Sequence, residues 1–221
     1  TAGIQPIVAD EGAYNLLFVF NFAAWWSQLS GTERIASNSM GKTKYAEDKG
    51  FLDSLTKAAE FYSKGYVNTD YITSKAAKNK FLQGEAALFT TGNWDIVDSE
   101  AALGEGNVGI MGVPQFSPDA PFTVPVIGGT GQSLAVAGYT EHPEMAVKFI
   151  SYLSSREVTA QFLKTTPKIS VRKDITPEDL GWQGKPVYEK ALELGSQLAY
   201  WTDNSQVPEV MNEYYKVGAL A

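Results

Sequence analysis

The residues that most enzymes use for nucleophilic or metal chemistry are nearly missing from this chain. It contains no Cys, and His142 is its single His. A thiolate nucleophile, a Cys-type zinc site and any metal site with two imidazoles are therefore excluded. His142 stands directly before Pro143, where a helix is expected to begin. We therefore interpret it as an N-cap or a solvated loop residue.

The carboxylates form no recognisable metal-binding or catalytic motif. They are spread along predicted helix faces, and residues 98–100 and 174–179 lack the alternating oxygen ligands and the fixed Gly of a calcium loop. We predict no metal site and no cofactor. A two-carboxylate glycosidase stays open, because its acid and base are neighbours in space and not in sequence.

One short segment has the residue types of a carbohydrate site. Gly92, Asn93 and Trp94 follow a predicted strand over 86–89, and open α/β sheets bind ligands beyond the carboxyl ends of their strands. An indole there can stack on the apolar C–H face of a sugar, and planar polar side chains such as that of Asn93 suit its polar rim. Taken alone, Trp94 is equally well explained as a core residue.

A second segment, Gly128-Gly129-Thr130-Gly131, is rich in glycine but is not a phosphate loop. No Gly-Lys-Ser/Thr follows it, and the next element is not a helix. Two interpretations remain open. It is either a hinge or tight turn that needs positive φ, or a backbone that a ligand approaches closely.

The composition indicates an acidic globular protein with many aromatic residues. There are 18 Lys plus Arg against 25 Asp plus Glu, a net charge of −7, which argues against a nucleic-acid partner. At 44% hydrophobic and 19% charged residues, the chain can bury a core. Its longest apolar runs fall short of the ~20 residues of a membrane-spanning helix. Aromatic residues make up 12% of the chain. Whereas the other features of the composition exclude functions, this aromatic content points toward a ligand-binding surface.

Short strands between longer helices predict an α/β fold. We expect Trp25 and Trp26 in the core, and loops over 31–43 and 114–132, which are rich in Gly, Ser, Asn, Thr or Pro; the second loop separates two lobes. Strands are expected over 4–9, 86–89, 108–113 and 133–137. Helices are expected over 14–29, 48–62, 76–81, 95–103, 143–153, 158–163, 186–200 and 208–220.

The run Phe-Leu-Gln-Gly-Glu-Ala-Ala-Leu-Phe-Thr-Thr-Gly-Asn-Trp over 81–94 resembles the F-x-x-G-x-A-A-M-x-x-x-G-x-W run of family 1 extracellular solute-binding proteins, the receptors of sugar ABC importers. Weaker similarities follow the same order across most of the chain. They lie at 62–67, 108–114, 128–129, 143–157 and 167–174. Their order and spacing make the match specific to the family.

The resemblance implies a periplasmic-binding-protein-like (type II) α/β receptor, whose two lobes close on a ligand. The match begins partway through the family's pattern, which implies a fragment that lacks most of the N-terminal lobe. Residues 1–131 and 172–221 would belong to the C-terminal lobe, and residues 132–171 to a segment that returns to the N-terminal lobe.

The implied function is binding of a sugar or oligosaccharide in the interlobe cleft, by aromatic stacking and hydrogen bonds, without enzymatic activity. The implied partners are the carbohydrate and the transmembrane subunits of an ABC permease. The protein would be an extracytoplasmic bacterial lipoprotein, anchored through a segment outside this sequence, and a monomer. The alternatives are a carbohydrate-active hydrolase with paired carboxylates, and the same fold binding a non-sugar solute such as a polyamine.

The resemblance also implies ligand-binding positions. Trp94 matches the family's sugar-stacking Trp, and Tyr14 matches an aromatic of an early helix that lines the cleft. The loop 129–131 matches a hinge-side loop that contacts ligand. The complete expected set is Trp94, Tyr14, Asn93, Gly129, Thr130, Gly131, Arg172, Trp201 and Asn15.

Overall fold

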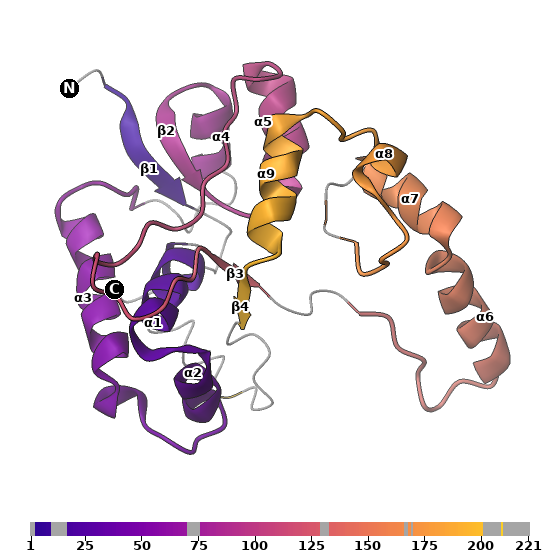
Figure 1. The fold of residues 1–221 in the computed structure, drawn as a ribbon, viewed down its shortest axis with the longest axis horizontal. Helices are drawn as coiled ribbons and strands as arrows, with labels where there is room; N and C mark the ends of the chain where they lie inside the picture. Colours follow the sequence, from indigo (N-terminus) through magenta and orange to yellow (C-terminus); the bar gives the residue numbers. More distant parts are fainter. Residues whose placement is uncertain are drawn as a thin grey trace.

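The computed structural model describes residues 3–9, 17–69, 76–128, 133–165, 168, 170–200 and 209. Short strands and longer helices alternate along these residues, as expected for an α/β fold. The strands and most helices form one body, and α6 (Pro143–Leu153) and α7 (Arg156–Thr165) extend away from it (Figure 1). Among the described residues, no helix has both the length and the apolar character needed to cross a membrane.

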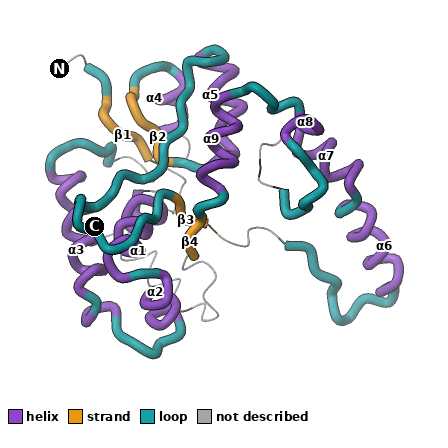
Figure 2. Tube along the Cα trace, in the orientation of Figure 1, coloured by secondary structure: helices purple, strands orange, loops and turns teal. Residues whose placement is uncertain are grey.

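Two pairs of parallel strands join segments that lie far apart in the sequence (Figure 2). Ala9 pairs with Thr90 at the end of the first pair, and Gly128 pairs with Tyr200 at the end of the second. Because paired parallel strands end at the same edge, the segments that follow them leave the sheet next to each other. The strands are β1 (Gln5–Ala9) with β2 (Ala86–Thr90), and β3 (Val126–Gly128) with β4 (Leu198–Tyr200).

Most of the predicted helices are confirmed, and Trp25 and Trp26 lie in the core with 2% and 0% of their surface exposed. His142 occupies the N-cap position of α6, without a side-chain capping bond. The remaining helical elements are η1 (a π-helical segment, Leu17–Phe22), α1 (Ala23–Ser30), α2 (Thr32–Ser39), η2 (Tyr45–Glu47), α3 (Lys49–Ser63), α4 (Ala76–Leu82), η3 (Asn93–Asp95), α5 (Ile96–Leu103), α8 (Pro177–Leu180) and α9 (Pro186–Gly195).

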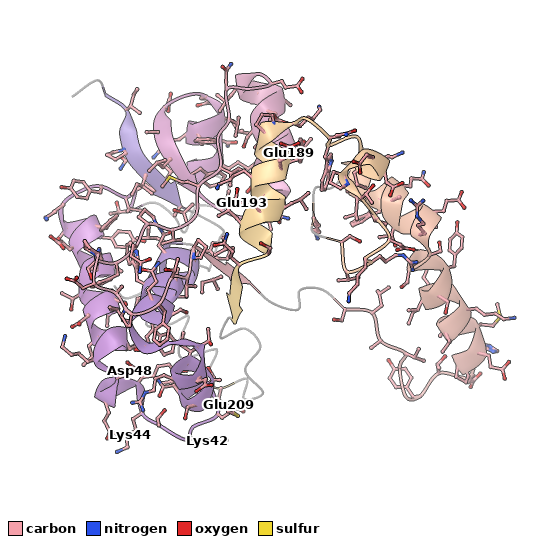
Figure 3. The ribbon with its side chains drawn as sticks, viewed as in Figure 1. Lys42, Lys44, Asp48, Glu189, Glu193 and Glu209 are labelled. Atoms are coloured by element: carbon pink, nitrogen blue, oxygen red, sulfur yellow. The ribbon has the colours of Figure 1, made fainter. Side chains whose placement is uncertain are left out.

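Asp48 joins α1, α2 and α3. It lies where the chain enters α3 and is 4% exposed (Figure 3). Burial opposes ionisation of this carboxyl group, but the hydrogen bonds it accepts outweigh that effect and hold its pKa below the usual value for Asp. The donors are Ser30 Oγ (2.6 Å), Trp26 Nε1 (2.9 Å), the Phe51 N–H (3.3 Å), which makes Asp48 the N-cap of α3, and Asn38 Nδ2 (2.9 Å).

The proline-rich segment before β3 is fixed to α1 by Gln28. Gln28 Nε2 donates to the Val124 carbonyl at 3.0 Å, and its Oε1 accepts from the Phe116 N–H at 2.6 Å. The Gln28 carbonyl accepts from the Phe122 N–H at 3.1 Å. One buried side chain therefore satisfies backbone groups of a segment that has little regular structure of its own.

α6 differs from the helices of the body. Within the part of the chain that the structure describes, none of its residues is buried. Met145, Phe149 and Tyr152 share one side of the helix and are 63%, 61% and 63% exposed. The following helix, α7, also extends away from the body, but its Leu163 is buried in a cluster with Trp182 and other residues of the α5, α8 and α9 region.

The loop predicted over 31–43 is wrong, because α2 occupies most of it. Ser, Asn and Thr are weak helix formers, and the sequence offers little periodicity here. The helix forms because Ile35 is buried and Asn38 bonds Asp48 at 2.9 Å. Tertiary contacts therefore outweigh intrinsic propensity.

The strands predicted over 108–113 and 133–137 are also wrong. In the first segment, the Val113 N–H donates to the Pro125 carbonyl at 2.7 Å, and the segment joins neither of the described strand pairs. The second segment is mostly exposed, with Leu134 at 62%. A run of apolar residues makes a strand only where another strand is available to pair with it.

Two further boundaries differ from the prediction. The helix expected over 186–200 ends at Gly195, because residues 198–200 pair with β3 as β4. The expected loop over 114–132 contains β3 itself. The helix expected over 208–220 lies outside the described residues apart from residue 209.

Candidate functional site

The candidate site is the turn that follows β2. The strand ends at Thr90, and η3 begins at Asn93 and leads into α5. The turn therefore leaves the carboxyl edge of the β1–β2 pair, which is the edge at which open α/β sheets bind ligands. This is the position that the sequence predicted for Asn93 and Trp94.

An ion pair between buried Asp95 and partly exposed Lys78 holds this turn in place. Asp95 is 5% exposed, and its carboxylate lies 2.7 Å from Lys78 Nζ of α4. The Thr91 hydroxyl also donates to Asp95, and the Asp95 N–H donates to the Gly92 carbonyl at 3.3 Å. Burial alone would lower the pKa of Lys78, but its bonds to Asp95 and Asp98 raise it above the usual value. The turn is thus anchored on both sides of Gly92.

Trp94 projects from the anchored turn and is 41% exposed. Its ring centroid lies 6.2 Å from that of Phe20, with the two planes tilted by 50°. Phe20 comes from η1, a π-helical segment, which is an irregularity that occurs often at functional sites. The two rings form an aromatic surface suited to the apolar face of a sugar.

Phe20 is a candidate binding residue that the sequence reasoning missed. The apolar face predicted for the helix over 14–29 runs through Leu17, Phe22 and Trp25, and Phe20 lies off it. A large aromatic residue off the predicted apolar face of an amphipathic helix is a usable signal for a second role. In the structure, Phe20 packs partly buried against the cluster of Ala9, Leu17 and Val67 and also contacts the Trp94 ring.

Asn93 lies at a different part of the same turn. It lines a small pocket together with Lys168, Trp182 and Tyr188. Trp182 and Tyr188 stack with their ring centroids 5.0 Å apart, and both are buried. The pocket holds only ≈ 10 Å³, about the room that one water needs. It is too small for a sugar ring in this conformation.

Arg172 makes contacts that stabilise its own loop. Its guanidinium donates to both carboxylate oxygens of Asp174, at 2.8 and 2.6 Å, and to the Ser154 carbonyl at 2.9 Å. Ser154 is the C-cap of α6, so Arg172 satisfies a carbonyl at that helix end. The structure does not bring it together with Trp94 through these contacts, and its expected role toward ligand stays a prediction.

Six of the expected positions lie outside the described residues: Tyr14, Asn15, Gly129, Thr130, Gly131 and Trp201. Each follows a strand that the structure does describe. Residues 14 and 15 follow β1, and Trp94 follows its partner β2. Residues 129–131 follow β3, and residue 201 follows its partner β4.

A surface hollow elsewhere in the described part of the chain does not have Trp94 in its lining. It has a volume of ≈ 520 Å³ and lies between α7 and α8. Arg156 in its wall pairs with Asp179 at 2.5 Å. Its lining is charged or polar apart from Ala160, so it lacks the aromatic surface of a sugar site. The lining residues are Arg156, Glu157, Ala160, Gln161, Lys164 and Asp179.

Comparison with known proteins identifies the family of this chain. The sequence profile described as "Bacterial extracellular solute-binding protein" matches residues 12–190 of the 221. No curated protein sequence matched the chain.

Three solved structures with the same fold have sugar-related names. A chitin oligosaccharide binding protein has a TM-score of 0.74 at 18% identity, over 100% of this chain and 60% of that one. A sugar transporter from Bacillus licheniformis, in complex with stachyose, has a TM-score of 0.71 at 14% identity, over 99% and 55%. A Streptococcus pneumoniae solute-binding protein, in complex with the blood group A-trisaccharide, has a TM-score of 0.70 at 13% identity, over 99% and 55%.

The present chain thus spans 55% to 60% of the length of these three proteins. At identities this low, the likeness establishes the fold, which is the solute-binding protein fold predicted from the sequence. The family profile covers well over half of the chain. The chain belongs to the bacterial extracellular solute-binding proteins.

Proposed function

We propose that this protein binds a sugar or oligosaccharide and has no enzymatic activity. The observation that carries the proposal is the half-exposed indole of Trp94, which lies beside Phe20 at the carboxyl edge of a parallel strand pair. The stachyose and trisaccharide held by two structural relatives support it. Trp94 is the stacking surface, and the other proposed ligand contacts are Asn93, Tyr14, Asn15, Gly129, Thr130, Gly131, Arg172 and Trp201.

The proposal includes a division into two lobes. Residues 1–131 and 172–221 form one lobe, and residues 132–171 belong to the other. The exposed apolar side of α6 supports this division, because such a helix face is normally covered by another element. In the proposed receptor, the second lobe covers this face and the ligand lies in the cleft between the lobes.

A hydrolase is the less favoured function. It would need two free carboxylates about 5 to 9.5 Å apart on either side of a glycosidic bond. Asp95 and Asp98, the carboxylates closest in sequence to Trp94, both pair with Lys78, at 2.7 and 2.6 Å. Their contacts therefore stabilise the turn, which agrees with a binding protein.

The proposed biological role is that of a monomeric receptor that delivers its ligand to the transmembrane subunits of an ABC importer. The membership of the chain in the extracellular solute-binding protein family supports this role. Anchoring by a lipid outside this sequence is a further part of the proposal.

Calorimetric titration of the full-length gene product tests the proposal. The panel contains stachyose, chitin oligosaccharides and a blood-group trisaccharide, with a polyamine such as spermidine as the non-sugar ligand. We expect heat from at least one oligosaccharide and none from spermidine. Chromogenic glycosides in the same buffer test for hydrolysis. Binding of spermidine alone, or sustained turnover of a glycoside, would overturn the proposed function.

A further inference from the structure

Gly92 lies against the face of the Trp94 ring. A Cβ atom placed on Gly92 would overlap the ring atoms Cζ3, Cη2 and Cε3, the farthest of them only 2.5 Å away. The three distances are nearly equal, so this position lies over the six-membered ring and not beyond its edge. The α-carbon of Gly92 is therefore the surface on which one face of the indole rests.

The backbone conformation of Gly92 does not itself require glycine. Its φ of −109° and ψ of 178° are extended values that any residue adopts. What a side chain at this position would disturb is the approach of the indole.

The backbone around Gly92 is poorly able to yield to such a side chain. Thr91 and Asp95 are bonded to each other on either side of it, and buried Asp95 is paired with Lys78 at 2.7 Å. Trp94 is 41% exposed, and its ring has room to move toward solvent. An added methyl group at Gly92 is therefore relieved by displacement of the ring, and the fold is preserved.

We propose that Gly92 is a positioning residue for ligand, whose missing side chain seats the Trp94 indole so that a sugar stacks on the ring face turned away from the backbone. This inference rests on the proposed function, and it adds that the indole is a one-sided platform. A ring that rests on the backbone is already placed before the ligand arrives, and such preorganisation favours affinity.

A double-mutant cycle in the full-length protein tests the role of Gly92. We expect Gly92→Ala to weaken binding of the best oligosaccharide at least fivefold, against about 30-fold for Trp94→Ala. In the Trp94→Ala background, Gly92→Ala should change affinity less than twofold, because Gly92 acts through the ring. A residue that merely stabilises the turn would not show this dependence on Trp94.

Gly109→Ala is the matched control. A Cβ atom at Gly109 meets nothing within 4 Å, so affinity and thermal midpoint should equal those of the wild type. The Gly92→Ala protein should also keep a wild-type thermal midpoint.

The outcomes separate this inference from the proposed function. No oligosaccharide binding by the wild type would overturn the proposed function and remove the basis of the inference. Wild-type binding with an unchanged Kd in Gly92→Ala would overturn the role of Gly92 alone. Equal losses in both backgrounds, or failure of Gly92→Ala to fold, would do the same.

Discussion

The junction of α1, α2 and α3 and the side of α6 are both built from amphipathic helices, but they differ in what covers them. At the junction, Trp26, Ile35 and Asp48 are buried, and the carboxylate is surrounded by donors. On α6, Phe149 and Tyr152 are more than half exposed. Helical periodicity therefore identifies an apolar face but does not say whether its partner lies in the same segment of chain.

The largest effect on stability is expected from a substitution at the junction of α1, α2 and α3. Asp48→Ala removes an N-cap and leaves Trp26 Nε1, Asn38 and Ser30 without their acceptor. We expect a loss of about 3 kcal/mol or more in the free energy of unfolding, measured by urea titration. Asp53→Ala is the control in the same helix, because the ion pair that the structure describes for Asp53 is a surface pair with Lys49. It should cost below about 0.5 kcal/mol, and equal losses in the two variants would contradict the role of Asp48.

The second prediction compares a buried with an exposed residue of the α6–α7 region. Leu163→Ala should cost about 2 to 4 kcal/mol in the 221-residue chain, since Leu163 is 4% exposed. Phe149→Ala should cost within about 0.5 kcal/mol, since that ring is 61% exposed.

The lobe proposal predicts a change for Phe149 in the full-length protein. If the second lobe covers α6, Phe149→Ala should there cost about 2 kcal/mol or more by the same urea titration. An unchanged small cost would contradict the proposed division at residues 132–171.

The smallest expected effect is the pH dependence of the contribution that Asp48 makes to the free energy of unfolding. Because the pKa of Asp48 is lower in the folded protein, its stabilising contribution is complete above the unfolded value of about 4. It is lost as the pH falls through the folded pKa. The stability difference between wild type and Asp48→Ala should thus be constant from pH 7 to pH 5 and shrink toward pH 3. A difference that stays constant to pH 3 would argue against an ionised Asp48.

The sequence predicted the elements whose signals are local. α3 combines a capping Asp48, periodic apolar residues and Gly65 just beyond its end, and the structure has it at the expected place. α2 was missed because its stability comes from Ile35 and Asn38 in contact with distant residues, which no local pattern reveals. The strand predicted over 108–113 failed for the opposite reason, since its apolar residues join neither of the strand pairs that the structure describes.

The candidate site was predictable in part. The order of Gly92, Asn93 and Trp94 after a strand predicted that the indole lies at the carboxyl edge of the sheet, and the structure has the turn there. The position of Phe20 off the apolar face could have marked it as a candidate, but its contact with Trp94 and the Lys78–Asp95 pair could not be predicted, because both depend on how separate segments pack. The pair Arg172–Asp174 shows the converse, a predicted site residue whose observed contacts stabilise its own loop.

The most direct test of the central claim is a calorimetric titration of the full-length Trp94→Ala protein with the oligosaccharide that the wild type binds best. Tyr139→Ala, at an aromatic residue that is 91% exposed in another segment, is the control. The structure predicts that Trp94→Ala lowers affinity about 30-fold while Tyr139→Ala leaves it unchanged. Wild-type affinity in the Trp94→Ala protein would contradict the claim that this indole is the sugar-stacking surface.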